Sequence, residues 1–168
     1  VGAWKDMEKA VKMGKVRAIG ISNFDANDEV FNEIMEKSTI KPAVLQMECH
    51  PYAQRVEMRK KAVKYGIQVE CWYPLGGAQS QGLLLRDPVI KKIAEAHGKS
   101  PAQIILRWHI QEGFSVIPGA TNPDYIKENI QIFDFALTDN EMQQIRSLNK
   151  EQRIFNASME DVERMVWG

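Results

Sequence analysis

The chain has 168 residues, 44% of them hydrophobic and 26% charged, and its 22 basic residues balance its 22 acidic ones. This composition is typical of one folded domain with a core, and the zero net charge excludes the long-range attraction that draws basic chains to nucleic acid or to anionic membranes. We therefore expect a small-molecule partner, since no apolar run approaches the ~20 residues of a membrane span and the first residues lack the layout of a secretory signal.

The first half of the chain alternates between predicted helices and strands. Residues 3–13 place apolar side chains on one helical face, and Gly14 ends that helix. A buried strand is predicted over 15–22, a helix over 25–37 and a second strand over 43–47. Because the chain opens inside a helical pattern without an initiator Met, we expect further sequence before residue 1.

The second half continues this alternation with stronger boundary signals. A helix is predicted over 54–65, a strand over 67–72, and helices near 88–97 and over 100–113. The last of these begins with an N-cap serine, a proline and a capping-box glutamine, and a glycine ends it. A fourth strand is predicted over 114–118.

The C-terminal part is predicted to be helical. Asn122 and Pro123 open a short helix, Thr138 and Glu141 form a second capping box, and a last amphipathic helix follows Ser158. Strands separated by helical crossovers predict a parallel sheet in an α/β fold. Four such strands fit either a small open sheet or half of an eight-stranded barrel.

Candidate binding residues stand where the predicted strands end. Ligands of parallel α/β folds bind at the carboxyl ends of the strands, which selects the segments 22–24, 46–50, 72–77 and 117–122. These segments offer hydroxyls, carboxamides, an indole and glycine-rich backbone, which are binding groups more than acids and bases. Taken singly, each residue also fits a strand-end cap or a packed core side chain.

The segment 117–129 is predicted to run from a strand through a glycine turn into a helix N-terminus, which suits a phosphate.

The spacing of Cys49, His50, Cys71 and His109 matches no zinc motif, so we expect no metal site. Two cysteines form no disulfide framework, and we expect packed thiols in a reducing cytoplasm. We expect His50 to shape the strand exit and His109 to be structural.

Read in order, these segments resemble the aldo-keto reductase family over essentially the whole chain. No single motif is specific, but several long ones occur in the family's order. The segments that carry the resemblance are WKDME with GKVRAIGISNF, QMECHPY, WYPLG, GKSPAQ with LRW, and IPG through IKEN.

The resemblance implies a (β/α)8 barrel of the TIM type that reduces aldehydes or ketones to alcohols with NADP(H) or NAD(H). Residues 1–168 would be its C-terminal half, strands 5 to 8, with a substrate-loop tail from about 150 to 168. The implied cofactor-binding residues are Ser22, Asn23 and Gln46 for the carboxamide, Trp72 for the nicotinamide ring, Tyr73, Leu75 and Gly77 for the pyrophosphate, and Ile117, Pro118, Gly119, Ala120, Thr121, Asn122, Tyr125, Glu128 and Asn129 for the adenosine end.

Two departures from the family pattern carry expectations of their own. The family's catalytic Asp, Tyr, Lys and His precede the helix with which this chain opens, so no catalytic residue is assigned and the chain alone should not turn over. The alternative is a nicotinamide-nucleotide-binding relative or regulatory subunit without useful activity. Gly119 and Tyr125 stand where a Lys and an Arg often grip the NADPH 2′-phosphate, which predicts relaxed or NAD(H)-leaning specificity, unless Lys127 compensates. Unpaired sheet edges predict self-association or a complementary N-terminal half.

Overall fold

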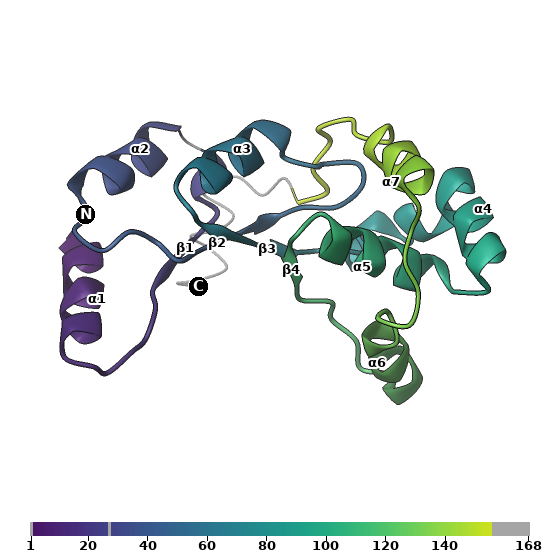
Figure 1. Cartoon of the computed structure of the whole chain (residues 1–168), viewed down its shortest axis with the longest axis horizontal. Coiled ribbons are helices and arrows are strands. Elements are labelled where there is room, and N and C mark those ends of the chain that lie inside the picture. Colours follow the sequence, from purple (N-terminus) through teal and green to yellow (C-terminus); the bar gives the residue numbers. More distant parts are fainter. Residues whose placement is uncertain (1, 27, 156–168) are drawn as a thin grey trace.

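The computed structural model describes residues 2–26 and 28–155, so the helix expected after Ser158 lies outside the described residues. Its centre is a four-stranded sheet in the order β1-β2-β3-β4 (Figure 1). All three neighbouring pairs of strands are parallel, as expected. The strands are β1 (Gly20–Ser22), β2 (Val44–Glu48), β3 (Gln68–Trp72) and β4 (Ser115–Val116).

Helices connect every strand to the next, which is what a parallel sheet requires. In Figure 1, α1 and α2 lie at one end of the molecule, α3 lies near its middle, and α4 to α7 lie at the other end. Their bounds are α1 (Gly2–Lys12), η1 (Phe24–Ala26), α2 (Asp28–Lys37), α3 (Val56–Lys64), η2 (Ala78–Ser80), η3 (Leu84–Arg86), α4 (Pro88–His97), α5 (Pro101–Gln111), α6 (Pro123–Ile130) and α7 (Asp139–Arg146).

The two outer strands are shorter than the sequence predicted. Residues 15–18 are not strand, because β1 pairs with β2 alone and β2 has no residue opposite them. The ladder starts with the Ala43 N–H donating to the Ile19 carbonyl at 2.8 Å. At the other edge the ladder ends after the Ile117 N–H, because Pro118 has no N–H to donate.

Both predicted capping boxes are confirmed. The Ser100 hydroxyl accepts the Gln103 N–H at 3.2 Å and the Gln103 side chain accepts the Ser100 N–H at 3.0 Å, and Thr138 and Glu141 make the same pair of bonds. A third cap was missed. Asp87 accepts the N–H groups that open α4.

The core has two parts. One packs β2 and β3 against α1, α2 and α3 through buried side chains such as Trp4, Phe31 and Leu45. The other lies among α4, α5 and α7 around Trp108 and Ile145, both fully buried. This packing fixes the four strand ends relative to one another. Within the described residues, no helix has the length and apolar character that a membrane crossing needs.

Candidate functional site

Three strand ends bring Ser22, Asn23, Gln46 and Trp72 together. Ser22 is in register with Gln46, and the Asn23 N–H donates to the Gln46 carbonyl at 2.8 Å. Asn23 has a φ of 61°, a left-handed conformation that asparagine tolerates and that turns its side chain out of the strand direction. The Trp72 indole N–H then donates to Asn23 Oδ1 at 2.8 Å. A hydrogen-bonded bridge therefore spans the carboxyl ends of β1, β2 and β3.

Gln46 is held from its other side by a residue that the sequence did not single out. Its Nε2 donates to Glu70 Oε1 at 2.7 Å, and the Ser115 hydroxyl donates to Glu70 Oε2 at 3.3 Å. Glu70 thus fixes the Gln46 amide orientation, with the nitrogen toward the carboxylate. The side-chain carbonyl oxygen of Gln46 is therefore the atom that remains to accept an N–H from a ligand.

Trp72 belongs to an aromatic group with Tyr73 and Phe155. Its ring lies edge-to-face with Tyr73 at 4.9 Å and with Phe155 at 5.6 Å between centroids. Tyr73 has a φ of 50°, and a Cβ built on Gly77 would meet the Tyr73 ring at 2.9 Å. The absence of a side chain at Gly77 is therefore what lets Tyr73 lie here. Phe155, from the end of the described chain, was not assigned to the site from the sequence.

A buried carboxylate holds that end of the chain in place. Glu48, fully buried at the end of β2, accepts the Ile154 N–H at 2.6 Å, the Phe155 N–H at 3.2 Å and Arg153 Nε at 2.9 Å. His50 Nε2 is a further partner at 3.2 Å. Burial works against the charged form of Glu48, but these hydrogen bonds outweigh it and lower its pKa to about 2. We call residues 153–155 with Glu48 the tail clamp.

Two cavities run from the aromatic group towards α6. The first, of about 450 Å³, is lined by Trp72, Tyr73, Pro74, Leu75, Gly77, Ala78, Ile117, Pro118 and Gly119. The second, of about 480 Å³, is lined by Leu75, Leu85, Ser100, Pro101, Ala102, Gly119, Ala120, Thr121, Asn122, Tyr125, Glu128 and Asn129. Both are lined by Leu75 and Gly119, so they are neighbours. Thirteen of the sixteen residues named from the sequence line one or both.

The far cavity is built around the start of α6. Asn122 caps this helix by accepting the Asp124 N–H at 2.9 Å, so its first turn presents backbone N–H groups at the cavity. Glu128 is fixed by a hydrogen bond from the Ser100 hydroxyl. Ser100 was identified from the sequence as an N-cap only. Its second role depends on α5 and α6 lying together, which no local pattern reveals.

The tyrosine and histidine nearest the β2 end are engaged in structural contacts. Burial and the Asp87 carboxylate, which accepts the Tyr52 hydroxyl at 2.6 Å, raise the pKa of Tyr52 to about 12. His50 is fully buried against Glu48. Neither group is set up to exchange a proton with a ligand in the cavities. That the chain contains no catalytic residue stays a prediction.

The structure brings together three residues whose spacing in the sequence did not predict that they form a cluster. Ligand atoms of Cys49, Cys71 and His109 all lie within 4.8 Å of one another in the core. Their separation along the chain hid this cluster, because it joins two strands to α5. The expectation that both cysteines are buried thiols is confirmed.

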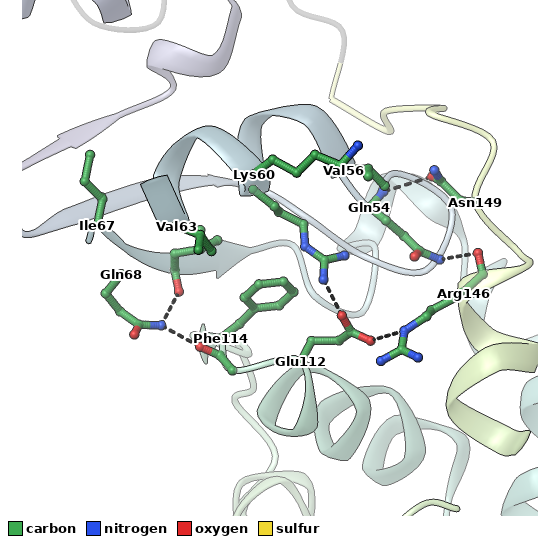
Figure 2. A pocket seen from close by; sticks show the side chains of 13 residues that line it. Gln54, Val56, Lys60, Val63, Ile67, Gln68, Glu112, Phe114, Arg146 and Asn149 are labelled. Atoms are coloured by element: carbon green, nitrogen blue, oxygen red, sulfur yellow. Dashed lines mark hydrogen bonds and ion pairs between the residues drawn. The ribbon is translucent and has the colours of Figure 1, made fainter. Parts of the chain in front are cut away.

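A further cavity, of about 630 Å³, lies elsewhere (Figure 2). It includes Gln68 and Phe114, at the amino ends of β3 and β4, which is the end opposite to the candidate site. Glu112 pairs there with both Arg59 and Arg146, so its charges are satisfied within the wall. We assign this cavity to the packing of α3 against α5 and α7.

Comparison with known proteins gives a consistent result. The model of the Aldo/keto reductase family matches residues 2–150. The chain is 44% identical over 156 residues to aldo-keto reductase family 1 member A1 of Gallus gallus, covering 89% of this chain and 47% of that protein. It is 42% identical to the 9,11-endoperoxide prostaglandin H2 reductase of Trypanosoma cruzi, covering 92% of this chain and 53% of that protein.

A solved structure agrees with these sequence matches. The crystal structure of a Gox0644 mutant in complex with NADPH superposes with a TM-score of 0.81 at 40% identity, covering 87% of this chain and 52% of that one. The chain spans about half the length of the curated relatives and solved structures that it matches.

Proposed function

Because this chain belongs to the aldo/keto reductase family, we propose that it forms the cofactor-binding part of an NAD(P)H-dependent reductase of aldehydes and ketones. The observation that carries the proposal is the neighbouring pair of cavities that extends from Trp72 to the N-terminus of α6. A carboxamide-binding group stands at one end and an anion-binding helix end at the other. Such a site suits a ligand with an amide, a flat ring and phosphates.

The residues present fit a nicotinamide dinucleotide. The side-chain carbonyl oxygen of Gln46 would accept a carboxamide N–H, because Glu70 already accepts the hydrogen bond of the Gln46 side-chain nitrogen. Ser22 and Asn23 would complete the carboxamide contacts, and Trp72 would lie against the ring. The turn from Gly119 into α6 would receive the phosphate and adenosine end. When bound, the cofactor supplies a hydride equivalent for carbonyl reduction.

The part of this chain in the reaction would be to bind and orient. Asn23 and Gln46 fix one face of the carboxamide and therefore which face of the ring is presented. The Trp72 indole cannot rotate freely, since its N–H is bound to Asn23 at 2.8 Å. The acid–base residues of the family would come from a further segment, so we propose that residues 1–168 alone do not turn over and that they form the C-terminal half of a barrel.

A second candidate function is nucleotide binding without reduction. It uses the same cavities and differs only in whether the full protein contains acid–base residues. The sequence around the adenosine end further supports relaxed or NAD(H)-leaning specificity, because Gly119 and Tyr125 bring no charge to a 2′-phosphate.

The test of cofactor binding is a fluorescence titration of the folded chain with NADPH and with NADH. We expect saturable binding of both. Gln46→Ala should weaken binding about tenfold, the effect of losing one hydrogen bond of about 1.4 kcal/mol. The matched control is Gln68→Ala, which removes the same side chain from the opposite end of the sheet. Failure of the folded chain to bind either nucleotide would overturn the proposal.

Activity requires a second measurement. NADPH and NADH oxidation with a broad aldehyde such as glyceraldehyde is assayed for the chain and for a longer protein that adds the upstream coding sequence. We expect activity only from the longer protein. A longer protein that binds nucleotide as tightly but shows no turnover would favour the non-enzymatic alternative.

A further inference from the structure

The core contains a dithiol next to an imidazole. Cys71 is in register with Met47, and Cys49 stands two residues beyond Met47, so both thiols project from the same face of the sheet. His109 reaches them from α5, and the three side chains are completely shielded from solvent. Their ligand atoms lie within 4.8 Å of one another. None of these atoms belongs to the candidate cofactor site.

His109 is held between two backbone carbonyl groups. Its Nδ1 is 2.8 Å from the Ile105 carbonyl oxygen and its Nε2 is 3.1 Å from the Cys49 carbonyl oxygen. These contacts fix the imidazole ring beside the two thiols.

Cys49 is the more acidic of the two thiols. Hydrogen bonds from Cys71 and from His109, together with the electrostatic effects of His109 and Arg59, hold the pKa of Cys49 well below its usual range despite burial. The Cys49 Sγ also lies 3.8 Å from the Gln54 carbonyl oxygen, to which the protonated thiol donates. Burial and the hydrogen bond to Cys49 raise the pKa of Cys71. Cys49 therefore releases its proton more easily than Cys71 and is the nucleophile of the pair.

We propose that Cys49 and Cys71 are an oxidisable dithiol that a hydroperoxide converts into an internal disulfide, with His109 stabilising the reactive thiolate. The Cys49 sulfur attacks a peroxide oxygen, the O–O bond breaks, and the departing hydroxide takes up the proton that the Cys49 thiol released, so that it leaves as water. Cys49 is then a sulfenic acid. The Cys71 sulfur attacks the Cys49 sulfur, an S–S bond forms, the S–O bond breaks, and the hydroxide leaves as water with the Cys71 proton. With hydrogen peroxide, one peroxide and two thiols give one disulfide and two waters.

Burial restricts the oxidant to a small one. Hydrogen peroxide is close to water in size, so a local opening of the core is sufficient for entry. A protein disulfide or glutathione disulfide has no comparable route to side chains without exposed surface. The site should therefore respond to peroxide and resist large disulfides.

A hydrogen bond from the His109 imidazole fits this geometry better than a metal ion. Zinc would stand about 2.0–2.3 Å from each nitrogen and sulfur ligand. The Cys49 carbonyl oxygen lies only 3.1 Å from Nε2 along the direction of its hydrogen bond. A metal ion on that line would be too close to the oxygen. Zinc binding is thus an outcome of the test that opposes the proposal.

The test uses the reduced, folded protein. It is exposed to hydrogen peroxide at pH 7, unfolded in the presence of a maleimide, and analysed by intact mass. We expect a monomeric product that carries no maleimide and has lost two hydrogen atoms. The Cys71→Ala variant should instead yield a sulfenic acid at Cys49 that dimedone traps. The same exposure with glutathione disulfide should leave both thiols free.

Variants of the two helical histidines separate the role of the imidazole from general effects. His109→Asn removes the imidazole beside the thiols and should slow disulfide formation about tenfold, because the thiolate fraction falls. His97→Asn, in α4 and paired with Glu141, should leave the rate unchanged. Two maleimide labels after a peroxide exposure that oxidises free cysteine, a disulfide between two chains, or one zinc ion per chain that protects both thiols would each overturn the proposal. The wild-type result is decisive even if His109→Asn does not fold.

Discussion

At the scale of single residues, Glu48 holds more partners than any other carboxylate described in the candidate site. Its pKa of about 2 lies below its ordinary value of 4.5, so the folded state prefers the charged form. The stability that this preference contributes is present above the ordinary value and is lost as pH falls towards 2. Arg153, Ile154 and Phe155 lose their acceptor over the same interval.

Glu48→Gln tests the tail clamp. An amide replaces one acceptor oxygen with a donor that faces backbone N–H groups, so we expect a loss on the order of 3 kcal/mol in the free energy of unfolding at pH 7. The variant should also lack the part of the acid destabilisation that the wild type shows between about pH 4.5 and 2. Urea unfolding measured over this pH range checks both, with the exposed Glu57→Gln as the control. Parallel pH profiles for wild type and Glu48→Gln would contradict the assignment.

Charge at the adenosine end is the second prediction at this scale. A Cβ at Gly119 meets no atom within 4 Å, and Tyr125 is 60% exposed, so both positions accept longer side chains. Gly119→Lys and Tyr125→Arg should each strengthen NADPH binding relative to NADH binding about tenfold or more, through charge-assisted hydrogen bonds to the 2′-phosphate.

The matched control adds the same charge elsewhere on α6. Ile130→Lys places a cation at a residue that is 67% exposed and does not line the far cavity. It should raise both affinities slightly and leave their ratio unchanged. A strong preference of the unmodified protein for NADPH would show that Lys127 or another group already supplies the missing contact.

At the scale of elements, the N-cap of α7 gives a direct test of local sequence control. Thr138 accepts the Glu141 N–H and donates its hydroxyl to the Glu141 carboxylate. Thr138→Ala should lower the free energy of unfolding by about 1 kcal/mol, measured by urea titration. Thr39→Ala, at an exposed threonine outside any helix, should change it by less than about 0.5 kcal/mol. Equal effects would mean that α7 is held by packing alone.

The same locality decides which elements could be predicted. Helices α4 and α5 and both capping boxes were predicted because serine, threonine, proline and glycine act within one turn. The outer strands were predicted too long, because strand length depends on a partner far away in sequence. Residues 15–18 have strand-forming side chains but no strand opposite them. The helix caps other than Asp87 could therefore be predicted from local sequence, whereas the lengths of the two outer strands could not.

Some residues of the candidate site could be predicted from the sequence and others could not, for the same reason. The rule that ligands meet the carboxyl ends of parallel strands identified Gln46, Trp72 and the turn before α6. Glu70 and the contribution of Ser100 to the site were not predicted, because each makes a hydrogen bond with a side chain from another element. Phe155 escaped because its place depends on Glu48, 107 residues earlier. Sequence periodicity contains no information on such pairs.

At the scale of the whole molecule, the sheet has two edges. Among the described residues, β1 and β4 each pair with a strand on one side only. Beside β4, the exposed side chains of Ile126, Ile130 and Phe133 line one apolar hollow together with Val116. Open edges and apolar surface of this kind favour association.

We therefore predict that the 168-residue chain by itself associates with a second copy or with a complementary half. Sedimentation over a range of concentrations should show a species larger than the monomer. Phe133→Lys, at a residue that is 63% exposed, should shift the equilibrium towards monomer without unfolding the chain. A stable monomer at every concentration would count against the prediction.

The tail clamp also links the C-terminal end of the described chain thermodynamically to the candidate site. Phe155 contacts both Trp72 and Tyr73, and Glu48 fixes Phe155 through its backbone N–H. If the binding of a ring against Trp72 displaces Phe155, the free energy of that displacement weakens the binding of the ligand. By reciprocity, whatever releases the tail must change the affinity by an equal factor. A carboxylate that touches no ligand would in this way set how tightly one is held.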